Sequence, residues 1–333
     1  MSDFAQLLPV TIAGTGSYLP ERVMTNDDLA EFVDTSDEWI RTRTGIGARR
    51  IAREDEPTSE LATNAAKAAL EQAGIAAADV ELIIVATITP DTLTPATACY
   101  VQQSLGAHKA VAFDISAACS GFLYAMKLAE KLIAAGAYQN AVIIGAEKLS
   151  AFVNWEDRTT CVLFGDGAGA AVLRPAQEGE GRILATDIGT DGGQTHLLNI
   201  PGGGSACPIT IENASEQLAT LSMLGREVFK HAVTRMKDSA LTVIERAGLT
   251  PDDIKVVVPH QANLRIIDAI ASRLKLPEER VFVNLEKYGN TSAAAVAIAL
   301  DEAHRTKRFE KGDNIVMVAF GAGLTWAAAA IQW

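Results

Sequence analysis

The stretch that decides the fold reads Val111-Ala-Phe-Asp-Ile-Ser-Ala-Ala-Cys119-Ser-Gly-Phe-Leu-Tyr-Ala-Met-Lys-Leu-Ala-Glu-Lys-Leu-Ile-Ala-Ala-Gly136. It begins with a short apolar run bounded by small residues, and apolar residues then recur at helical spacing from Phe122 to Ile133. Gly136 is a typical residue for the end of a helix. The pattern predicts a strand, a tight turn and a helix, with Cys119 in the turn.

The predicted position of Cys119 favours a reactive thiolate. The first turn of a helix has unpaired N–H groups and the positive end of the helix dipole, which stabilise an anion by about 0.3 to 2 kcal/mol. This gain makes a better nucleophile, but a complete catalytic site needs a partner base or further hydrogen-bond donors. Taken alone, the stretch favours the alternative, in which Cys119 is a small buried apolar residue.

The second half of the chain repeats the first. Residues 73–84 are repeated at 247–258 and residues 140–144 at 314–318, both at an offset of 174 positions. The strand and helix around Cys119 are repeated at 281–300, at an offset of 171. Three offsets so nearly equal predict a duplicated α/β unit, in which buried strands alternate with amphipathic helices.

The length of the chain agrees with two halves. A chain of 333 residues exceeds the size at which one hydrophobic core stops growing. A polar, glycine-containing segment at 174–186 places the seam there, so we expect halves at residues 1–174 and 175–333. The other predicted elements are a strand at 10–16, a polar helix and loop at 34–46, a helix at 58–73, strands at 79–88 and 140–145, two strands around a glycine-rich turn at 161–173, and a long surface loop at 187–213.

The duplication predicts that three polar side chains meet at the seam. Cys119 and Asn290 are expected in matching turns before matching helices. His260 ends a predicted strand and corresponds to Ala86 in the first half, so a titratable group stands where the repeat has none. A thiol, an imidazole and a carboxamide are therefore expected at the ends of otherwise apolar strands.

Composition and charge exclude several classes of function. The formal charge of −12 argues against nucleic-acid binding and means that an acidic partner needs a local basic patch. No leader and no apolar run of about 18 residues is apparent, so we expect a cytoplasmic protein without a membrane partner. The four cysteines contain no Cys-x-x-Cys pair and the five histidines are scattered, so neither a disulfide framework nor a metal site is expected.

Four motifs resemble one known family. In chain order they are Ala117–Phe122, Val258–Ile266, Gly289–Ala294 and Phe320–Trp326. Together they resemble the 3-oxoacyl-[acyl carrier protein] synthase III family, the ketoacyl synthases that start type II fatty acid synthesis, and the likeness runs from Val10 to Trp333. The resemblance implies the thiolase-like fold, an α/β arrangement of five layers (α-β-α-β-α) from two duplicated halves, and a homodimer.

The resemblance also implies roles for individual residues. Cys119, His260 and Asn290 would form the catalytic triad. The coenzyme A site would have Trp39 and Arg158 on either side of the adenine, with Arg43, Thr44, Gly225 and Asn263 nearby. The carrier-protein docking segment would consist of Gln261, Ala262, Asn263, Leu264 and Arg265, with Lys230 and Arg273 beside it. The oxyanion and acyl pocket would include Gly323, Phe320, Leu149, Phe164 and Thr94.

The family chemistry needs no tightly bound cofactor. An acyl-CoA primer would be transferred to Cys119, and malonyl-carrier protein would then lose carbon dioxide and attack the acyl group, giving a 3-oxoacyl-carrier protein. The coenzyme A thioester and the phosphopantetheine arm of the carrier are substrates in this scheme. His260 and Asn290 would donate hydrogen bonds to the enolate that forms on decarboxylation.

Three residues depart from the family pattern. Arg226 stands where some members have Asn, which affects contacts with pantetheine. Ala322 replaces the middle glycine of a Phe-Gly-Gly-Gly motif, and its backbone N–H can still donate. Thr94 stands where some members have a bulky Phe at the end of the primer pocket, so we expect primers longer than acetyl.

Several alternatives stay open at this point. A specialised condensing enzyme of the same fold, making quinolone or polyketide precursors, has the same motifs. Asn290 disfavours a thiolase, which would have a second histidine there. A papain-like protease also uses Cys, His and Asn in this order, but the cysteine lacks the Cys-Gly-x-Cys-Trp surroundings. A non-catalytic carrier-binding protein is disfavoured because all three reactive side chains are present.

Overall fold

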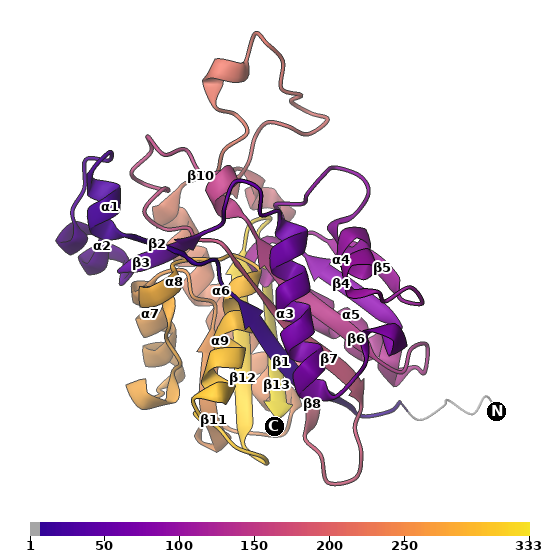
Figure 1. The fold of residues 1–333 in the computed structure, drawn as a ribbon. Coiled ribbons are helices and arrows are strands. Elements are labelled where there is room, and N and C mark those ends of the chain that lie inside the picture. The colour runs from indigo at the N-terminus through magenta and orange to yellow at the C-terminus, as the bar shows by residue number, and fades with distance from the viewer. Residues whose placement is uncertain (1–6) are drawn as a thin grey trace.

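The computed structural model describes residues 7–333 and has the helices and strands shown in Figure 1. The strands are β1 (Val10–Tyr18), β2 (Arg22–Thr25), β3 (Ala48–Ile51), β4 (Leu82–Ala86), β5 (Val111–Ile115), β6 (Ala141–Glu147), β7 (Gly167–Pro175), β8 (Arg182–Thr190), β9 (Leu198–Asn199), β10 (Ser222–Met223), β11 (Ile254–Pro259), β12 (Asn314–Gly321) and β13 (Thr325–Gln332). The helices are α1 (Asn26–Ala30), α2 (Asp37–Thr44), α3 (Thr58–Ala73), α4 (Thr97–Leu105), α5 (Gly121–Ala134), α6 (Gly225–Arg246), α7 (Leu264–Leu274), α8 (Leu285–Tyr288) and α9 (Ala294–Arg305).

Two large sheets share one strand order. The first runs β1-β7-β6-β4-β5, with β4 parallel to both β5 and β6, and β7 antiparallel to its neighbours. The second runs β8-β13-β12-β11, and an isolated bridge between Val257 and Val281 continues it beyond β11. Every residue of β4 and of β6 is buried, as expected for strands that are covered on both faces.

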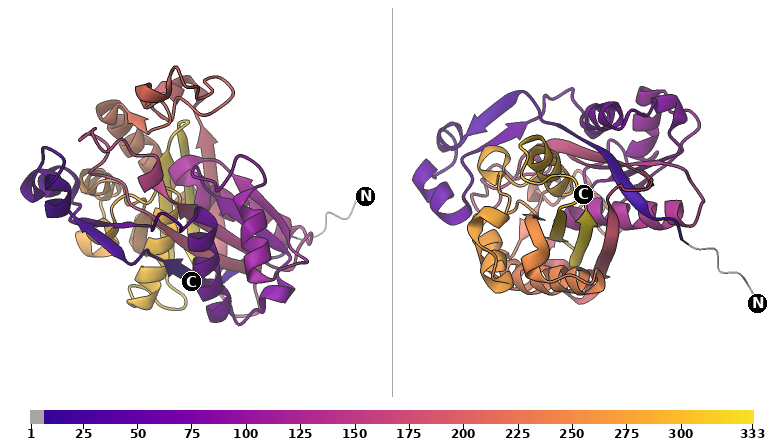
Figure 2. Two further views of the ribbon diagram at one scale, coloured as in Figure 1. Left: turned by 45° about the horizontal axis from the view of Figure 1, so that its top comes forward. Right: turned by 90° about the horizontal axis from the view of Figure 1, so that it is seen from below.

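Helices cover both faces of each sheet, which gives five layers (Figures 1 and 2). Helices α3 and α4 contact the outer face of the first sheet, and α6 contacts the second sheet with α7 beside it. Helices α5 and α9 lie between the sheets and contact strands of both. The predicted five-layer thiolase-like fold is confirmed.

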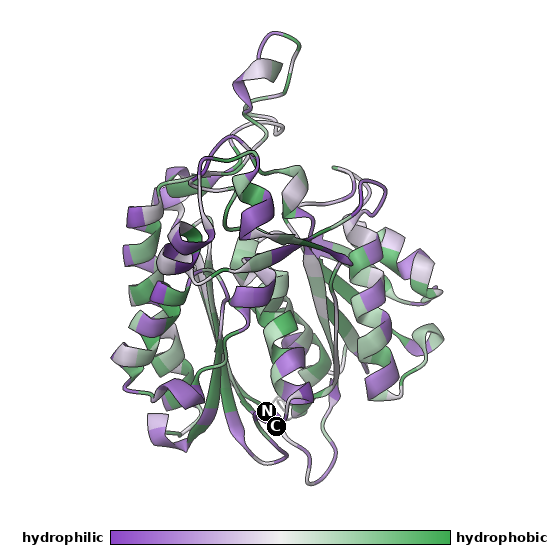
Figure 3. Cartoon of the chain, turned by 60° about the vertical axis from the view of Figure 1, so that its left-hand side comes forward, coloured by the Kyte–Doolittle hydropathy of each residue, from purple (hydrophilic) through white to green (hydrophobic). Residues whose placement is uncertain are grey.

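The apolar residues form one core in each space between layers. The outer core of the first sheet is rich in alanine from α3, and the middle core contains Phe122, Met126 and residues of both sheets. The third core lies between the second sheet and α6. Figure 3 shows the same division, with hydrophobic residues along the strands and on the helix faces that meet them.

The middle helices approach the strands unusually closely. A Cβ atom at Gly121 would lie 2.8 Å from the Cβ of Ala86, and one at Gly145 would collide with the backbone of Ala293. These glycines let the first turns of α5 and α9 meet at the ends of the inner strands. The beginnings of both helices therefore lie close together in the middle of the molecule.

Local periodicity located most elements correctly. The predicted helix at 58–73 coincides with α3 and ends at Gly74, which has φ of +65°. The strand, turn and helix around Cys119 are confirmed as β5, a 3₁₀ turn at Ala118–Ser120, and α5. The predicted boundary between residues 174 and 175 falls at the last residue of β7, before the turn that leads to β8.

Two predictions were wrong. The segment at 161–173 forms one strand, β7, preceded by turns, because the backbone of Leu163 and Gly165 bonds to Asn290 before α9 instead of forming a hairpin. The predicted surface loop at 187–213 begins as a strand, since Asp187 to Thr190 complete β8 along β13. This strand contains Gly and polar residues, because most of its positions are only partly buried. Its sequence therefore lacks the apolar pattern that predicts a strand.

A side unit comprising β2, α1, α2 and β3 extends from the body of the molecule (Figure 1). Arg49 in β3 attaches it, since this guanidinium is fully buried and donates to Asn26 Oδ1 at 2.9 Å and to the carbonyl of Val162 at 2.8 Å. Burial lowers the pKa of Arg49 to about 10. No helix of residues 7–333 combines the length and the apolar character needed to cross a membrane.

Candidate active site

Cys119 lies in a strained turn between β5 and α5. Ala118, which precedes it, has φ of +46°, a left-handed conformation that is uncommon for a residue with a side chain. Gly321 of β12 lies against this turn, because a Cβ there would come within 2.6 Å of the Cys119 nitrogen. The thiol is held in place by its backbone and is only 8% exposed.

Asn290 lies in the corresponding turn before α9. Its backbone N–H donates to the carbonyl of Leu163 at 2.8 Å, and its side-chain Oδ1 accepts from the Ser292 N–H at 2.9 Å. Because the oxygen is already bonded, the amide nitrogen is the group that can donate into the cavity. Asn290 is therefore oriented as a hydrogen-bond donor.

The two turns share a backbone feature that fixes their alignment. Ser292 has φ of +48°, and it precedes α9 as Ala118 precedes α5. Pairing these residues restores the offset of 174 and aligns Cys119 with Ala293. Asn290 therefore stands in the matching turn, as predicted, but three residues before the position equivalent to Cys119.

His260 follows β11 and its ring is buried. Its backbone N–H donates to the Val318 carbonyl at 2.8 Å, and the residue is 4% exposed. Burial lowers the pKa of His260 to about 4, so the imidazole is neutral near pH 7. Within residues 7–333, its Nδ1 atom has no hydrogen-bond partner. A neutral imidazole suits hydrogen-bond donation better than it suits an ion pair with a thiolate.

The thiol of Cys119 differs from the helix-dipole prediction. Burial raises the pKa of Cys119 to about 12, while the Ser292 hydroxyl lowers it and the charge of Glu147 raises it further. Loss of hydration therefore outweighs the helix terminus. The resting group is a thiol, and its proton must leave when the sulfur reacts.

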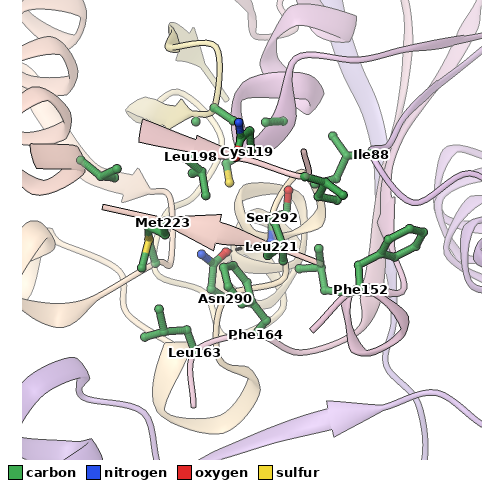
Figure 4. A pocket seen from close by; sticks show the side chains of 18 of the residues that line it. Ile88, Cys119, Phe152, Leu163, Phe164, Leu198, Leu221, Met223, Asn290 and Ser292 are labelled. Atoms are coloured by element: carbon green, nitrogen blue, oxygen red, sulfur yellow. Dashed lines mark hydrogen bonds between the residues drawn. The ribbon is translucent and has the colours of Figure 1, made fainter. Parts of the chain in front are cut away.

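All three side chains line one cavity of about 1470 Å³. Figure 4 shows Cys119 and Asn290 facing each other across it, among apolar side chains such as Leu198 and Phe164. The other predicted site residues on its wall are Trp39, Arg43, Thr44, Gly225, Ala262, Asn263, Arg265, Leu149, Phe164 and Phe320. The cavity thus joins the thiol to the surface beside Trp39.

Trp39 marks the mouth of the cavity, and two guanidinium groups lie over its ring. Arg43 lies 4.4 Å and Arg158 lies 4.9 Å from the centre of its ring, both within cation–π range. Arg158 also donates to the Asp34 carbonyl at 2.7 Å. An adenine between Trp39 and Arg158 would need about 7 Å, two contact distances, so Arg158 must move to admit it.

Several predicted residues lie away from the cavity wall. Gln261 is 1% exposed, and its side chain donates to the Pro259 carbonyl at 2.8 Å and accepts from the Asn284 N–H at 2.9 Å, which makes it an internal brace. Within the described range, Thr94 and Gly323 are not on the cavity wall. Thr92 and Leu93 line the cavity near Thr94, and Gly321 and Ala322 line it near Gly323. Arg158, Leu264, Lys230 and Arg273 also lie outside the wall.

Sequence reasoning missed two polar residues beside the thiol. Ser292 lies on the cavity wall, and its hydroxyl donates to Glu147 at 3.0 Å. Ser292 belongs to the Gly-Asn-Thr-Ser motif, which was a usable signal for it. Glu147 ends a strand among apolar residues, and no local pattern marks it.

Comparisons with known proteins agree with this geometry. Models of 3-oxoacyl-[acyl-carrier-protein] synthase III and of its C-terminal part match residues 113–192 and 244–333. A beta-ketoacyl-[acyl-carrier-protein] synthase III of Caldanaerobacter subterraneus is 56% identical over 97% of each chain.

Solved structures extend the likeness to three dimensions. The synthase III of Aquifex aeolicus is 49% identical, with a TM-score of 0.90 over 97% of this chain and 100% of that one. A priming β-ketosynthase of the R1128 polyketide pathway is 37% identical, with a TM-score of 0.90 over 98% and 96%. The chain belongs to the 3-oxoacyl-[acyl-carrier-protein] synthase III family.

Proposed function

We propose that this chain is an acyltransferase that starts type II fatty acid synthesis. It transfers an acyl primer from acyl-CoA to Cys119 and condenses it with malonyl-carrier protein, releasing coenzyme A, carbon dioxide and 3-oxoacyl-carrier protein. One observation carries this proposal. The side chains of Cys119, His260 and Asn290 are buried and line the same cavity, most of whose other lining residues are apolar.

In the first step, the sulfur of Cys119 attacks the thioester carbonyl. The tetrahedral oxyanion is held by backbone N–H groups, for which the Cys119 nitrogen and the loop at 320–323 are the candidates. The close approach of Gly321 to the Cys119 nitrogen supports this assignment, because it brings the loop and the turn together.

In the second step, loss of carbon dioxide leaves an enolate that needs hydrogen-bond donors. The neutral His260 ring and the Asn290 amide supply them, and no strong base is required. The carbanion then attacks the acyl group on Cys119. Burial strengthens these hydrogen bonds because the local dielectric constant is low.

The mouth of the cavity binds the two carriers of acyl groups. Trp39, Arg43 and Arg158 take the coenzyme A nucleotide, with Thr44, Gly225 and Asn263 along the pantetheine arm. The carrier protein docks on Ala262, Asn263, Leu264 and Arg265, with Lys230 and Arg273 as neighbouring cations. Gln261 is left out of this surface because its side chain is buried. No tightly bound cofactor takes part.

We extend the proposal to the organisation of the chain. The halves at 1–174 and 175–333 descend from one duplicated unit, and the shared strand order and the shared left-handed turn support this. The protein works as a homodimer in the cytoplasm.

The primer is longer than acetyl in this proposal. The support for it is the cavity of about 1470 Å³, which has room for an acyl chain beside pantetheine. Thr94 is exposed and lies off the cavity wall formed by residues 7–333, so its small size does not support the longer primer. A specialised condensing enzyme is the second candidate, and the likeness to the R1128 priming ketosynthase favours considering it.

Mass spectrometry of the intact protein after incubation with a panel of acyl-CoAs tests the proposal. We expect an acyl adduct on Cys119, stronger for medium-chain primers than for acetyl. A strong preference for acetyl contradicts the longer primer, and no adduct from any acyl-CoA contradicts the function. Turnover of the adduct with malonyl-carrier protein then separates fatty acid initiation from a specialised pathway.

A further inference from the structure

A buried carboxylate lies behind the nucleophile and has no task in the mechanism above. Glu147 ends β6 and is 0% exposed. It accepts hydrogen bonds from the Thr89 hydroxyl at 2.7 Å, the Thr87 hydroxyl at 3.1 Å and the Ile88 N–H at 3.1 Å. Burying a carboxylate is costly unless it is well hydrogen-bonded, so its presence here calls for a reason.

Ser292 connects this carboxylate to the thiol. Its hydroxyl donates to Glu147 Oε1 at 3.0 Å, and Ser292 and Cys119 line the same cavity. Figure 4 shows the Ser292 hydroxyl and the Cys119 sulfur on the same part of the cavity wall. While the sulfur is a thiol, the hydrogen of this hydroxyl goes to Glu147, so the Ser292 oxygen is free to accept from the thiol. Once the sulfur is a thiolate, the hydroxyl can donate to it instead, which is how Ser292 lowers the pKa of Cys119. A proton can therefore move from sulfur through Oγ to the carboxylate.

We propose that Glu147 accepts the proton of Cys119 through the Ser292 hydroxyl when the thiol attacks its substrate. This inference rests on the proposed acylation of Cys119 and adds the group that activates it. Glu147 does not touch the substrate, so it is a positioning and proton-accepting residue that acts through Ser292.

The step balances without a further reactant. The S–H bond of Cys119 breaks and its proton bonds to Ser292 Oγ, while the proton of Ser292 passes to Glu147 Oε1. The electron pair left on sulfur forms the new bond to the thioester carbon, and coenzyme A leaves as a thiolate. After the sulfur is acylated, Glu147 returns its proton to Ser292 Oγ while the Ser292 hydroxyl gives its own proton to the departing thiolate, so Glu147 ends as a carboxylate again.

The surroundings suit Glu147 better than His260 for this task. Burial raises the pKa of Glu147 to about 7, which is near the working pH of a general base, whereas burial holds the pKa of His260 at about 4. The groups that face Glu147 are the hydroxyls of Thr87, Thr89 and Ser292, the Ile88 N–H, and the Cys119 thiol.

Alkylation of Cys119 by iodoacetamide tests the relay, because it requires the thiolate but no acyl-CoA. The rate is measured from pH 5.5 to 9 for the full chain and for Glu147→Gln, Glu147→Asp and Ser292→Ala. We expect the unchanged protein to have an inflection near pH 7. Glu147→Gln and Ser292→Ala should lose it and react about 100-fold more slowly at pH 8, while Glu147→Asp should keep it.

The opposite result has a clear meaning. If Glu147 affected the thiol only through its negative charge, Glu147→Gln would lower the pKa of Cys119 and speed alkylation. A faster rate, or an unchanged inflection in both variants, overturns the relay. Circular dichroism checks folding, and Ser292→Ala carries the test should Glu147→Gln fail to fold.

Asp166 provides the matched control. It is buried, accepts from the Ser150 hydroxyl at 2.6 Å, and is not on the cavity wall within residues 7–333. Asp166→Asn should therefore leave the alkylation profile unchanged, and an equal loss of the inflection there would contradict a specific role for Glu147. An alkylation profile as expected, with no acyl adduct from acyl-CoA, would leave the relay standing and remove the proposed function.

Discussion

The floor of the cavity and its mouth use opposite kinds of chemistry. At the floor, Cys119, His260 and Asn290 are 8%, 4% and 7% exposed, and burial keeps the first two uncharged near pH 7. At the mouth, two guanidinium groups lie over the Trp39 ring, and the Arg158 side chain is 43% exposed. The floor therefore offers desolvated neutral groups, while the mouth offers charge that is in contact with water.

This comparison predicts different kinetic effects for the two regions. Groups that meet only the transition state change kcat, whereas groups that bind the substrate and the transition state equally change KM. Changes at the floor should act on kcat and changes at the mouth on KM.

The largest effect is expected from Cys119→Ala. Without the sulfur no acyl-enzyme can form, and the condensation rate should fall by more than about 1000-fold. Intact-protein mass spectrometry and product formation measure this. Cys161→Ala is the control, because this cysteine is buried and lies off the cavity wall that the described residues form. An acyl adduct on the Cys119→Ala protein would contradict the floor as the reaction site.

His260→Ala and Asn290→Ala should divide the floor into two functions. Each removes a donor to the enolate, so decarboxylation of malonyl-carrier protein should fall by about 100- to 1000-fold while Cys119 still becomes acylated. Carbon dioxide release and the acyl adduct are measured separately. If His260→Ala prevents acylation as well as decarboxylation, the proposed division of roles is wrong.

The pH dependence of stability should also distinguish the floor. Burial raises the pKa of Glu147 above its ordinary value of 4.5 to about 7, so the native state binds the proton more tightly than the unfolded state. The stability that this gives is complete below pH 4.5 and is lost as pH rises through 7.

In the unchanged protein, the free energy of unfolding should fall between pH 5 and pH 8 as Glu147 loses its proton. In Glu147→Gln this fall should be smaller by on the order of 1 to 3 kcal/mol. Urea unfolding at a series of pH values measures the difference. The mouth variant Trp39→Ala removes no titrating group, so its curve should run parallel to that of the unchanged protein. A Glu147→Gln curve that is also parallel would mean that this carboxyl is not desolvated as described.

The smallest effect is expected at the mouth. Trp39→Ala should raise KM for acyl-CoA about tenfold, because it removes one aromatic contact with the substrate. It should leave kcat unchanged. Trp326→Ala is the control, because Trp326 also has a guanidinium stacked on it, that of Arg235 at 4.4 Å, but lies off the described cavity wall. A fall in kcat for Trp39→Ala would contradict the prediction that the mouth affects KM and the floor affects kcat.

Much of the fold could be predicted because its signals are periodic. The helix at α3 and the buried strands β4 and β6 have strong local patterns, and the repeat offsets relate one half to the other. Strand β8 was missed because six successive residues of it are half-buried without alternation, and because its partner β13 lies far along the chain. A short window of sequence contains no information about a pairing partner that lies so far along the chain.

The site divides in the same way. Cys119, His260 and Asn290 belong to local motifs, so their meeting could be anticipated. The hydrogen bond from Ser292 to Glu147 joins residues 145 positions apart, and only the folded chain reveals it. Helix position alone gave the wrong direction for the pKa of Cys119, because burial depends on the whole fold.

Arg49 makes the spacing between the mouth and the floor a fixed length. Its guanidinium joins the side unit that bears Trp39 to the carbonyl of Val162, and Phe164, two residues further on, forms a bridge with Asn290. In the proposed reaction, a thioester arm that enters at Trp39 would therefore have to span a distance that these contacts hold between the side unit and the turn before α9.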